Sequence, residues 1–115
     1  MAKYLDEGLI IHEREKNALI FGTVIWEAAA ALAKYFAWQA GRGTTWHGCN
    51  VLELGAGTGI LGLMLGKFGA RVVLTDHEPR VMELLAQNIA ANGLKHTVTS
   101  KVLDWADPVS FLQHE

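Results

Sequence analysis

Three glycines spaced two residues apart follow a short apolar run, and this is where the sequence most clearly indicates chemistry. The run spans residues 51–54, and the glycines are Gly55, Gly57 and Gly59. Glycine lets the backbone turn sharply and approach a ligand more closely than a residue with a Cβ atom can. The helix expected from Thr58 to Lys67 would direct its free N–H groups toward the same place. The spacing therefore predicts a loop that binds a nucleotide cofactor.

The position of the third glycine distinguishes two classes of cofactor. A dinucleotide-binding loop follows G-x-G-x-x-G/A, and its third small residue would fall on Ile60. Here the third glycine is Gly59, which gives the pattern E-L-G-x-G-x-G from Glu53 onward. An NAD-dependent oxidoreductase is therefore disfavoured, and the sequence offers no identifiable partner for hydride transfer.

An acidic residue after the next apolar run supports a ribose-containing cofactor. Asp76 follows the run 71–75 and lies about 20 residues beyond the first glycine, where a βαβ unit places the carboxylate that binds a ribose diol. The alternative role of Asp76 is to cap the next helix. Pro79 is typical of a first helical residue, which assigns that cap to Glu78. The two roles of Asp76 are compatible.

Strands and helices that could position these residues alternate along the chain. Strands are expected at 49–54, 71–76 and 97–103, and helices at 24–38, 58–67 and 79–91. Short apolar runs such as 51–54 are typical of parallel strands buried on both faces. The alternation predicts an α/β fold.

Composition and charge limit the number of domains and the kinds of binding partner that the chain can have. With 115 residues, 50% hydrophobic and 19% charged, the chain is sized for one domain with a buried core. A net charge of -2 without a basic run argues against a nucleic-acid partner. No stretch has the length and flanks of a membrane span, so no membrane association is predicted.

The cysteine and the histidines favour neither a disulfide nor a metal site. Cys49 is the only cysteine, which indicates a reducing compartment; we expect the cytoplasm, with the nucleus as the alternative. Because Cys49 enters the first strand, we expect it to be a small core residue. The five histidines show no metal-ligand spacing, and no metal is predicted.

Several motifs occur in an order that resembles one enzyme family. They are G-T-V-I-W-E-A-A from Gly22, V-L-E-L-G-A-G-T-G-I-L-G from Val51, L-T-D ending at Asp76, Asn88 with Asn92, and L-D-W ending at Trp105. This order resembles the seven-strand protein-lysine methyltransferases of the methyltransferase-like 21 group, over nearly the whole chain. The resemblance implies a Rossmann-like, doubly wound parallel sheet. It also implies S-adenosylmethionine as methyl donor and a lysine of a partner protein as acceptor.

The resemblance implies roles for the loop residues. Gly55, Ala56 and Gly57 would contact the carboxypropyl amine and sulfur region of the cofactor, and Gly59 would also belong to the cofactor-binding residues. Glu53 would orient the loop and the cofactor amine through hydrogen bonds. No catalytic residue is assigned.

Further roles fall on residues after the loop. Asp76 would bind the ribose hydroxyls, and Trp105 would flank the adenine. The alternative for Trp105 is to anchor the end of an edge strand. Asp104 either bonds the adenine amine or caps the next helix. Glu27 stands where the family more often has aspartate.

Trp26 lies off the apolar stripe of the N-terminal helix. That stripe predicts a helix packed on the sheet, and its residues are Ile25, Ala28, Ala29, Leu32 and Phe36. Trp26 either belongs to the core or contacts the methionine end of the cofactor. In the second case its indole face would attract the sulfonium cation by roughly 0.5–2 kcal/mol. Periodicity does not separate these interpretations, and the resemblance implies the second, a contact between Trp26 and the methionine end of the cofactor.

The family's acceptor site has no counterpart in this sequence. In the family the fourth strand is followed by a D-x-x-Y-like motif that lines the lysine channel, and three further strands complete the sheet. We therefore expect a single partial domain, with an N-terminal segment and helix at 1–48 and a cofactor-binding half at 49–115. The strand at 49–54 would then be unpaired along one edge, and we expect the chain to self-associate there, to bind a partner or to express poorly.

Two functions are consistent with these observations. The first is an S-adenosylmethionine-dependent protein-lysine methyltransferase that, as this short chain, is weakly active or inactive. The second is a non-catalytic module that binds S-adenosylmethionine or a partner protein. A small-molecule methyl acceptor is a further alternative to a protein.

Overall fold

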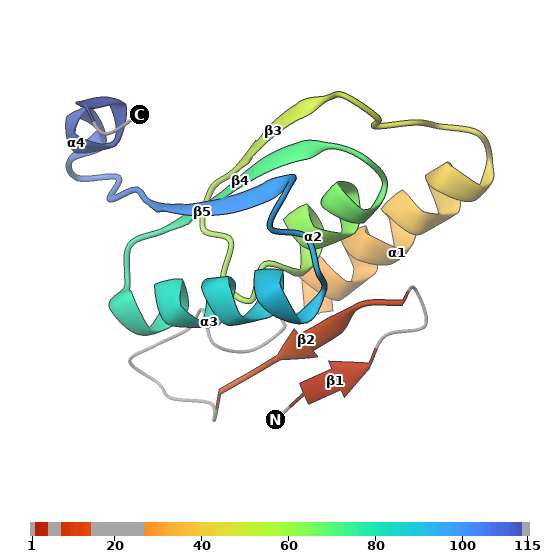
Figure 1. Ribbon diagram of the computed structural model, residues 1–115, viewed down its shortest axis with the longest axis horizontal. Helices are drawn as coiled ribbons and strands as arrows, with labels where there is room; N and C mark the ends of the chain where they lie inside the picture. Colours follow the sequence, from red (N-terminus) through yellow and green to blue (C-terminus); the bar gives the residue numbers. More distant parts are fainter. Residues whose placement is uncertain (1, 5–7, 15–26, 114–115) are drawn as a thin grey trace.

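Three parallel strands form the central sheet. The computed structural model describes residues 2–4, 8–14 and 27–113. Its sheet has the order β3 (Asn50–Glu53), β4 (Arg71–Asp76) and β5 (Val98–Val102). Val72 of the middle strand pairs with Val51 on one side and with Val98 on the other. Figure 1 shows this sheet together with the helices that connect its strands, which confirms the predicted α/β fold with parallel strands.

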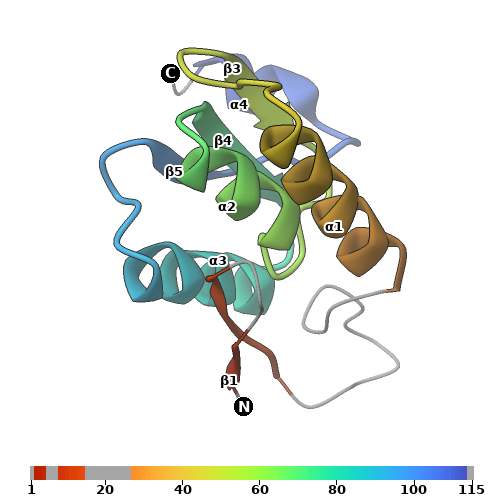
Figure 2. The ribbon, with the colours of Figure 1, turned by 90° about the vertical axis from the view of Figure 1, so that its right-hand side faces the viewer.

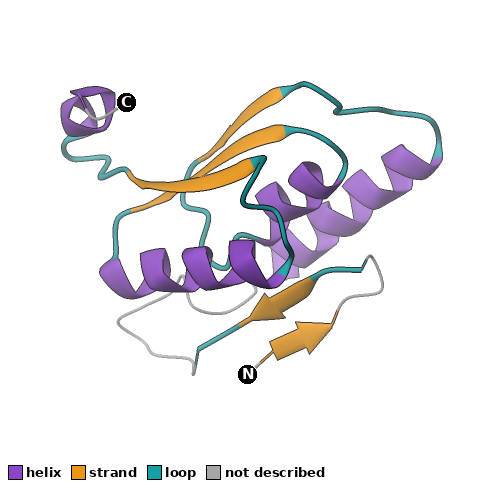
Figure 3. Cartoon of the chain, viewed as in Figure 1, coloured by secondary structure: helices purple, strands orange, loops and turns teal. Residues whose placement is uncertain are grey.

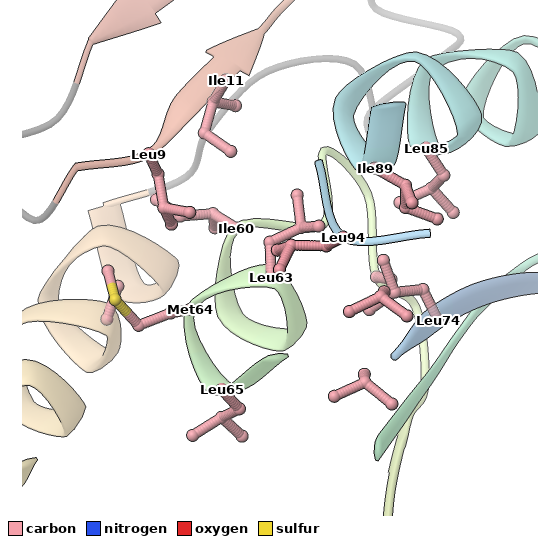
Figure 4. Packing of buried hydrophobic residues seen from close by; sticks show 14 of the residues in the cluster. Leu9, Ile11, Ile60, Leu63, Met64, Leu65, Leu74, Leu85, Ile89 and Leu94 are labelled. Atoms are coloured by element: carbon pink, nitrogen blue, oxygen red, sulfur yellow. The ribbon is translucent and has the colours of Figure 1, made fainter. Parts of the chain in front are cut away.

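Two helices connect the strands, and a third lies beside them. Helix α2 (Ile60–Lys67) joins β3 to β4, and helix α3 (Pro79–Ala91) joins β4 to β5. Helix α1 (Glu27–Gly41) packs against α2, as Figure 2 shows from the side. The apolar side chains between these helices and the sheet form the core seen in Figure 4, where Leu63 of α2, Leu74 of β4 and Leu85 of α3 are fully buried.

A short antiparallel hairpin at the N-terminus was not predicted. Strands β1 (Ala2–Tyr4) and β2 (Ile10–His12) pair with each other, and β2 packs on α3. Leu9 and Ile11 are buried in the main core. The hairpin thus forms a further layer on the side of α3 away from the sheet, which Figure 3 shows in orange below the purple helix. Three-residue strands give too short a pattern for periodicity to reveal.

The expectation that the first strand is buried on both faces was wrong. β3 is an edge strand that pairs only with β4 within the described residues, and Leu52 and Leu54 are 52% and 56% exposed. Cys49, expected in the core, is also exposed. Helices α1, α2 and α3 lie on one side of the sheet, so side chains that point to the other side stay accessible (Figure 1).

On the open side of the sheet, the last helix makes a partial cover. Phe111 of α4 (Pro108–Gln113) lines a hollow of about 530 Å³ with Leu52, Val73 and Thr99. This hollow contains no residue of the glycine loop. Exposed apolar side chains beside an unpaired strand edge favour association with another chain. This exposure is consistent with self-association through β3, which stays a prediction.

The predicted stripe of α1 is only partly correct. Leu32, expected to face the core, is 40% exposed, whereas Ala33 is buried and Ala29 and Phe36 pack against the core from their partly buried positions. The residues of α1 that contact the core, Ala29, Ala33 and Phe36, are therefore spaced four and three apart, as residues on one helix face are. Ile25 lies outside the described residues. None of the described helices has the length and apolar character needed to cross a membrane.

Candidate cofactor-binding site

The glycine loop lies at the carboxyl end of β3, and its backbone requires glycine. Gly55, Gly57 and Gly59 have φ values of 62°, 58° and 86°, in the left-handed region that other residues rarely adopt. The N–H of Ala56 donates to the Thr75 carbonyl at 2.8 Å, which ties the loop to β4. The loop thus turns from β3 into α2 beside the end of the neighbouring strand.

The third glycine faces the core. A Cβ atom on Gly59 would lie 3.0 Å from Leu85 Cδ2 and 3.1 Å from Leu74 Cδ1, closer than these side chains accept without moving. Gly59 therefore lets the start of α2 pack tightly against α3 and β4. A contact between Gly59 and the cofactor stays a prediction.

Asp76 ends β4 and holds the glycine loop. Its Oδ2 accepts a hydrogen bond from the Gly57 N–H at 3.2 Å, and its Oδ1 accepts one from the His77 N–H at 2.8 Å. The helix cap belongs to Glu78, whose Oε2 accepts from the N–H groups of Arg80 and Val81 at 3.0 and 3.3 Å. The prediction that Glu78, and not Asp76, caps this helix is confirmed. Asp76 is left at the carboxyl edge, beside the loop.

Glu53 supports the loop from the end of β3. Its Oε1 accepts a hydrogen bond from the Gly62 N–H at 2.9 Å, so it satisfies one of the free donors in the first turn of α2. Burial, with a smaller contribution from the nearby Asp76 carboxylate, raises the pKa of Glu53 to about 7, although the Gly62 hydrogen bond opposes this shift. Two carboxylates from adjacent strands therefore meet at the carboxyl edge of the sheet, a place suited to a cationic ligand.

We expect Glu53→Gln to reduce the loss of stability between pH 5 and pH 8. Because the pKa of Glu53 is higher in the folded protein than its ordinary value of 4.5, the folded state binds more protons, and stability falls as pH rises through this window. The shift corresponds to at most about 3 kcal/mol. Glutamine keeps an acceptor for Gly62 and does not titrate. Urea unfolding at the two pH values measures the effect.

A control for this experiment is Glu83→Gln, at an exposed position on α3. This variant should keep the pH dependence of the unmodified protein. If Glu53→Gln and Glu83→Gln show the same dependence of unfolding free energy on pH, Glu53 does not titrate with a raised pKa.

Trp105 lies next to the first glycine, across the carboxyl edge. A Cβ atom on Gly55 would be 3.6 Å from Trp105 Cζ2, so the indole ring borders the loop. Trp105 is 72% exposed, which argues against the alternative that it anchors the edge strand by burial. Asp104 Oδ1 accepts from the Ala106 N–H at 2.9 Å and so caps a turn ahead of α4. The aromatic face is available beside the loop.

One predicted residue and one unpredicted residue remain to be located. Trp26 lies outside the described residues, and both of its interpretations stay predictions. Asn88 was not predicted as a site residue, yet its side chain reaches the loop by donating to the Thr58 carbonyl at 2.8 Å. The signal that could have found it is a polar residue within the apolar stripe of the helix 79–91.

The family is decided by a match over almost the whole chain. A sequence profile described as lysine methyltransferase matches residues 3–115. The chain belongs to this family. It is 33% identical over 106 residues to protein N-lysine methyltransferase METTL21A of Xenopus tropicalis, covering 90% of this chain and 47% of that protein. It is 40% identical over 68 residues to EEF1A lysine methyltransferase 3 of the same organism, covering 59% and 29%. The family resemblance inferred from the motifs is confirmed.

Solved structures of methyltransferases share the fold of this family member. Pyrococcus horikoshii TYW2 in complex with MeSAdo has a TM-score of 0.63 at 18% identity, covering 90% of this chain and 36% of that one. Coclaurine N-methyltransferase with N-methylheliamine and SAH has a TM-score of 0.53 at 24% identity, covering 82% and 25%. These likenesses confirm the Rossmann-like fold class. The chain spans about half the length or less of the curated relatives named above.

Proposed function

We propose that this chain is the S-adenosylmethionine-binding part of a protein-lysine methyltransferase. The observation that carries the proposal is the hydrogen bond from the Gly57 N–H to Asp76, because it joins the glycine loop to a carboxylate that, in our proposal, binds the ribose. Family membership supports S-adenosylmethionine as the cofactor. The METTL21A relatives support a protein lysine as the acceptor.

The residues at the carboxyl edge fit this cofactor. Carboxylates favour ligands that carry positive charge, and S-adenosylmethionine carries a sulfonium and an ammonium group. In our proposal Asp76 accepts hydrogen bonds from the ribose hydroxyls, and the backbone of Gly55, Ala56 and Gly57 lies along the carboxypropyl end. Trp105 stacks on the adenine, and Glu53 orients the amine.

The contribution of these residues to methyl transfer is positioning. When bound, the cofactor supplies an electrophilic methyl group, and the acceptor lysine must be a neutral amine aligned with it. Glu53 and Asp76 fix the loop and thereby the orientation of the donor. We assign no residue of this chain to the acceptor or to catalysis. The proposal places the protein in the cytoplasm, with the nucleus as the alternative, because its one cysteine suits a reducing compartment.

A second candidate is a non-catalytic module that binds the cofactor and a partner protein. The observation that favours it is the exposed apolar surface formed by Leu52 of β3 and Leu54 just beyond it, both more than half exposed. Both candidates predict the same cofactor. They differ in whether a methyl group leaves it.

Calorimetry with three ligands tests the shared part of the proposal. We expect S-adenosylmethionine and S-adenosylhomocysteine to bind and NAD to give no heat of binding, since Ile60 stands where a dinucleotide loop needs a small residue. Tighter binding of NAD than of S-adenosylmethionine would contradict the cofactor assignment. A radiolabelled methyl group separates the two candidates: transfer to protein lysine supports the enzyme, and binding without transfer supports the module.

A further inference from the structure

A buried asparagine connects the N-terminal hairpin to the cofactor loop. Asn88 of α3 is fully buried. Its Oδ1 accepts from the His12 N–H at 2.7 Å, and its Nδ2 donates to the His12 carbonyl at 3.1 Å. The same Nδ2 donates to the Thr58 carbonyl at 2.8 Å. One amide therefore joins three segments: strand β2, helix α3 and the glycine loop.

The contacts with the hairpin and with the loop require the same orientation of this amide. A neutral amide has one acceptor oxygen and one donor nitrogen, so whichever group meets the His12 N–H must be the oxygen. That choice turns the NH₂ group toward the Thr58 carbonyl. With the hairpin in place, the Asn88 Nδ2 group is oriented to donate one hydrogen to the Thr58 carbonyl and the other to the His12 carbonyl.

A second asparagine, the C-cap residue of α3, makes the same contact with the hairpin but not with the loop. Asn92 Oδ1 accepts from the Ile10 N–H at 2.8 Å, and its Nδ2 donates to the Ile10 carbonyl at 2.7 Å. Its other donated bond, at 2.8 Å, goes to the carbonyl of Asn88 in its own helix. The two asparagine side chains thus hydrogen-bond the backbone of every second residue of β2, as the backbone of a neighbouring strand would. This pair supplies an internal control.

The loop is held from two sides next to the predicted ligand position. The Gly57 N–H donates to Asp76, and the carbonyl of the next residue, Thr58, accepts from Asn88. Thr58 is 2% exposed, so without Asn88 its carbonyl would lack this partner in a buried place. Gly57, at the first of these contacts, is also one of the loop residues that the cofactor is proposed to approach.

We infer that Asn88 is a positioning residue that couples docking of the N-terminal hairpin to cofactor binding. The inference rests on the proposed function, since it needs S-adenosylmethionine to bind at this loop. A ligand that stabilises the loop stabilises the Thr58 contact, and through the fixed amide it stabilises the hairpin. By linkage the hairpin strengthens ligand binding by the same factor.

The test combines calorimetry with hydrogen exchange, using S-adenosylhomocysteine as the probe. In the unmodified chain, saturating probe should slow the exchange of the Ile10 and His12 amides. Asn88→Ala should weaken probe binding by about tenfold, and the exchange of Ile10 should no longer respond to the probe. Asn92→Ala should keep the affinity within about threefold and should retain the response of His12. If both asparagines had only a structural role, both variants would lose stability, but they would not differ in probe affinity or in the response of amide exchange to the probe.

The outcomes distinguish the inference from the proposed function. If the unmodified chain does not bind the probe, the proposed function fails. If it binds the probe but the exchange of Ile10 and His12 is unchanged, the coupling is refuted without any variant. Asn88→Leu, which fills the buried volume, replaces Asn88→Ala if alanine prevents folding. Equal affinity of Asn88→Leu and the unmodified chain would also overturn the inference.

Discussion

Replacing Gly57 by valine is expected to abolish cofactor binding while leaving the helices intact. Gly57 has a φ of 58°, and its N–H is the donor that joins the loop to Asp76. A branched Cβ is strained at this φ and would occupy space at the edge where the ligand must approach. We expect affinity for S-adenosylmethionine to fall at least about 100-fold, measured by calorimetry, with little change in helical circular dichroism.

The control for backbone strain is Gly43→Val. Gly43 also has a left-handed backbone, with a φ of 93°, and a Cβ there would meet no atom within 4 Å. Each variant is expected to lose about 1–3 kcal/mol of stability from strain. Only Gly57→Val should lose the ligand. Normal binding by Gly57→Val would mean that the glycine serves the turn alone.

Asp76→Asn is expected to weaken S-adenosylmethionine binding by about 1.5–3 kcal/mol, roughly 10- to 100-fold in the dissociation constant. The substitution keeps the size of the side chain but removes the negative charge that strengthens hydrogen bonds from the ribose hydroxyls. The Asp76 side chain is 13% exposed, so solvent replaces little of what is lost. Calorimetry at constant pH and salt measures the difference.

Glu78→Gln is the matched control for Asp76→Asn. Glu78 lies two residues further along the same turn and caps α3 through the N–H groups of Arg80 and Val81. Its substitution should affect the melting temperature more than the affinity for the ligand. If Asp76→Asn binds S-adenosylmethionine as tightly as Glu78→Gln does, Asp76 is not the ribose-binding residue.

Elements that depend on local chemistry were predicted closely from the sequence. Helix α3 begins at Pro79 and ends at Ala91, as expected, because its signals are adjacent in the chain. Glu78 accepts the free N–H groups at the start, and Gly93 adopts a φ of 64° just beyond the end. Strand β4 likewise has the predicted bounds.

The meeting of the glycine loop with Asp76 was also predictable. In a βαβ unit, adjacent parallel strands end at the same edge of the sheet, so motif spacing converts directly into proximity. The hydrogen bond between Gly57 and Asp76 is the observed result. The family follows from the same residues, because several ordered motifs are more specific than one.

The exposure of the first strand was decided by tertiary structure. The unpaired edge of this strand was expected and is observed in the part of the chain that the structure describes. Its apolar sequence also predicted burial on both faces, yet Leu52 and Leu54 are exposed because helices α1, α2 and α3 lie on one side of the sheet only. The exposure of Cys49 has the same origin. A strand's own residues specify its alternation, whereas the elements packed around it determine which faces are covered.

The role of Asn88 likewise depended on the folded chain. Its position in helix α3 follows from the sequence, but its partner His12 lies 76 residues away, and Asn92 bonds Ile10 across 82 residues. Local spacing specifies which residues share a helix face. It cannot specify which distant backbone that face will meet, because that contact forms only when the hairpin packs its own buried side chains, Leu9 and Ile11, into the common core.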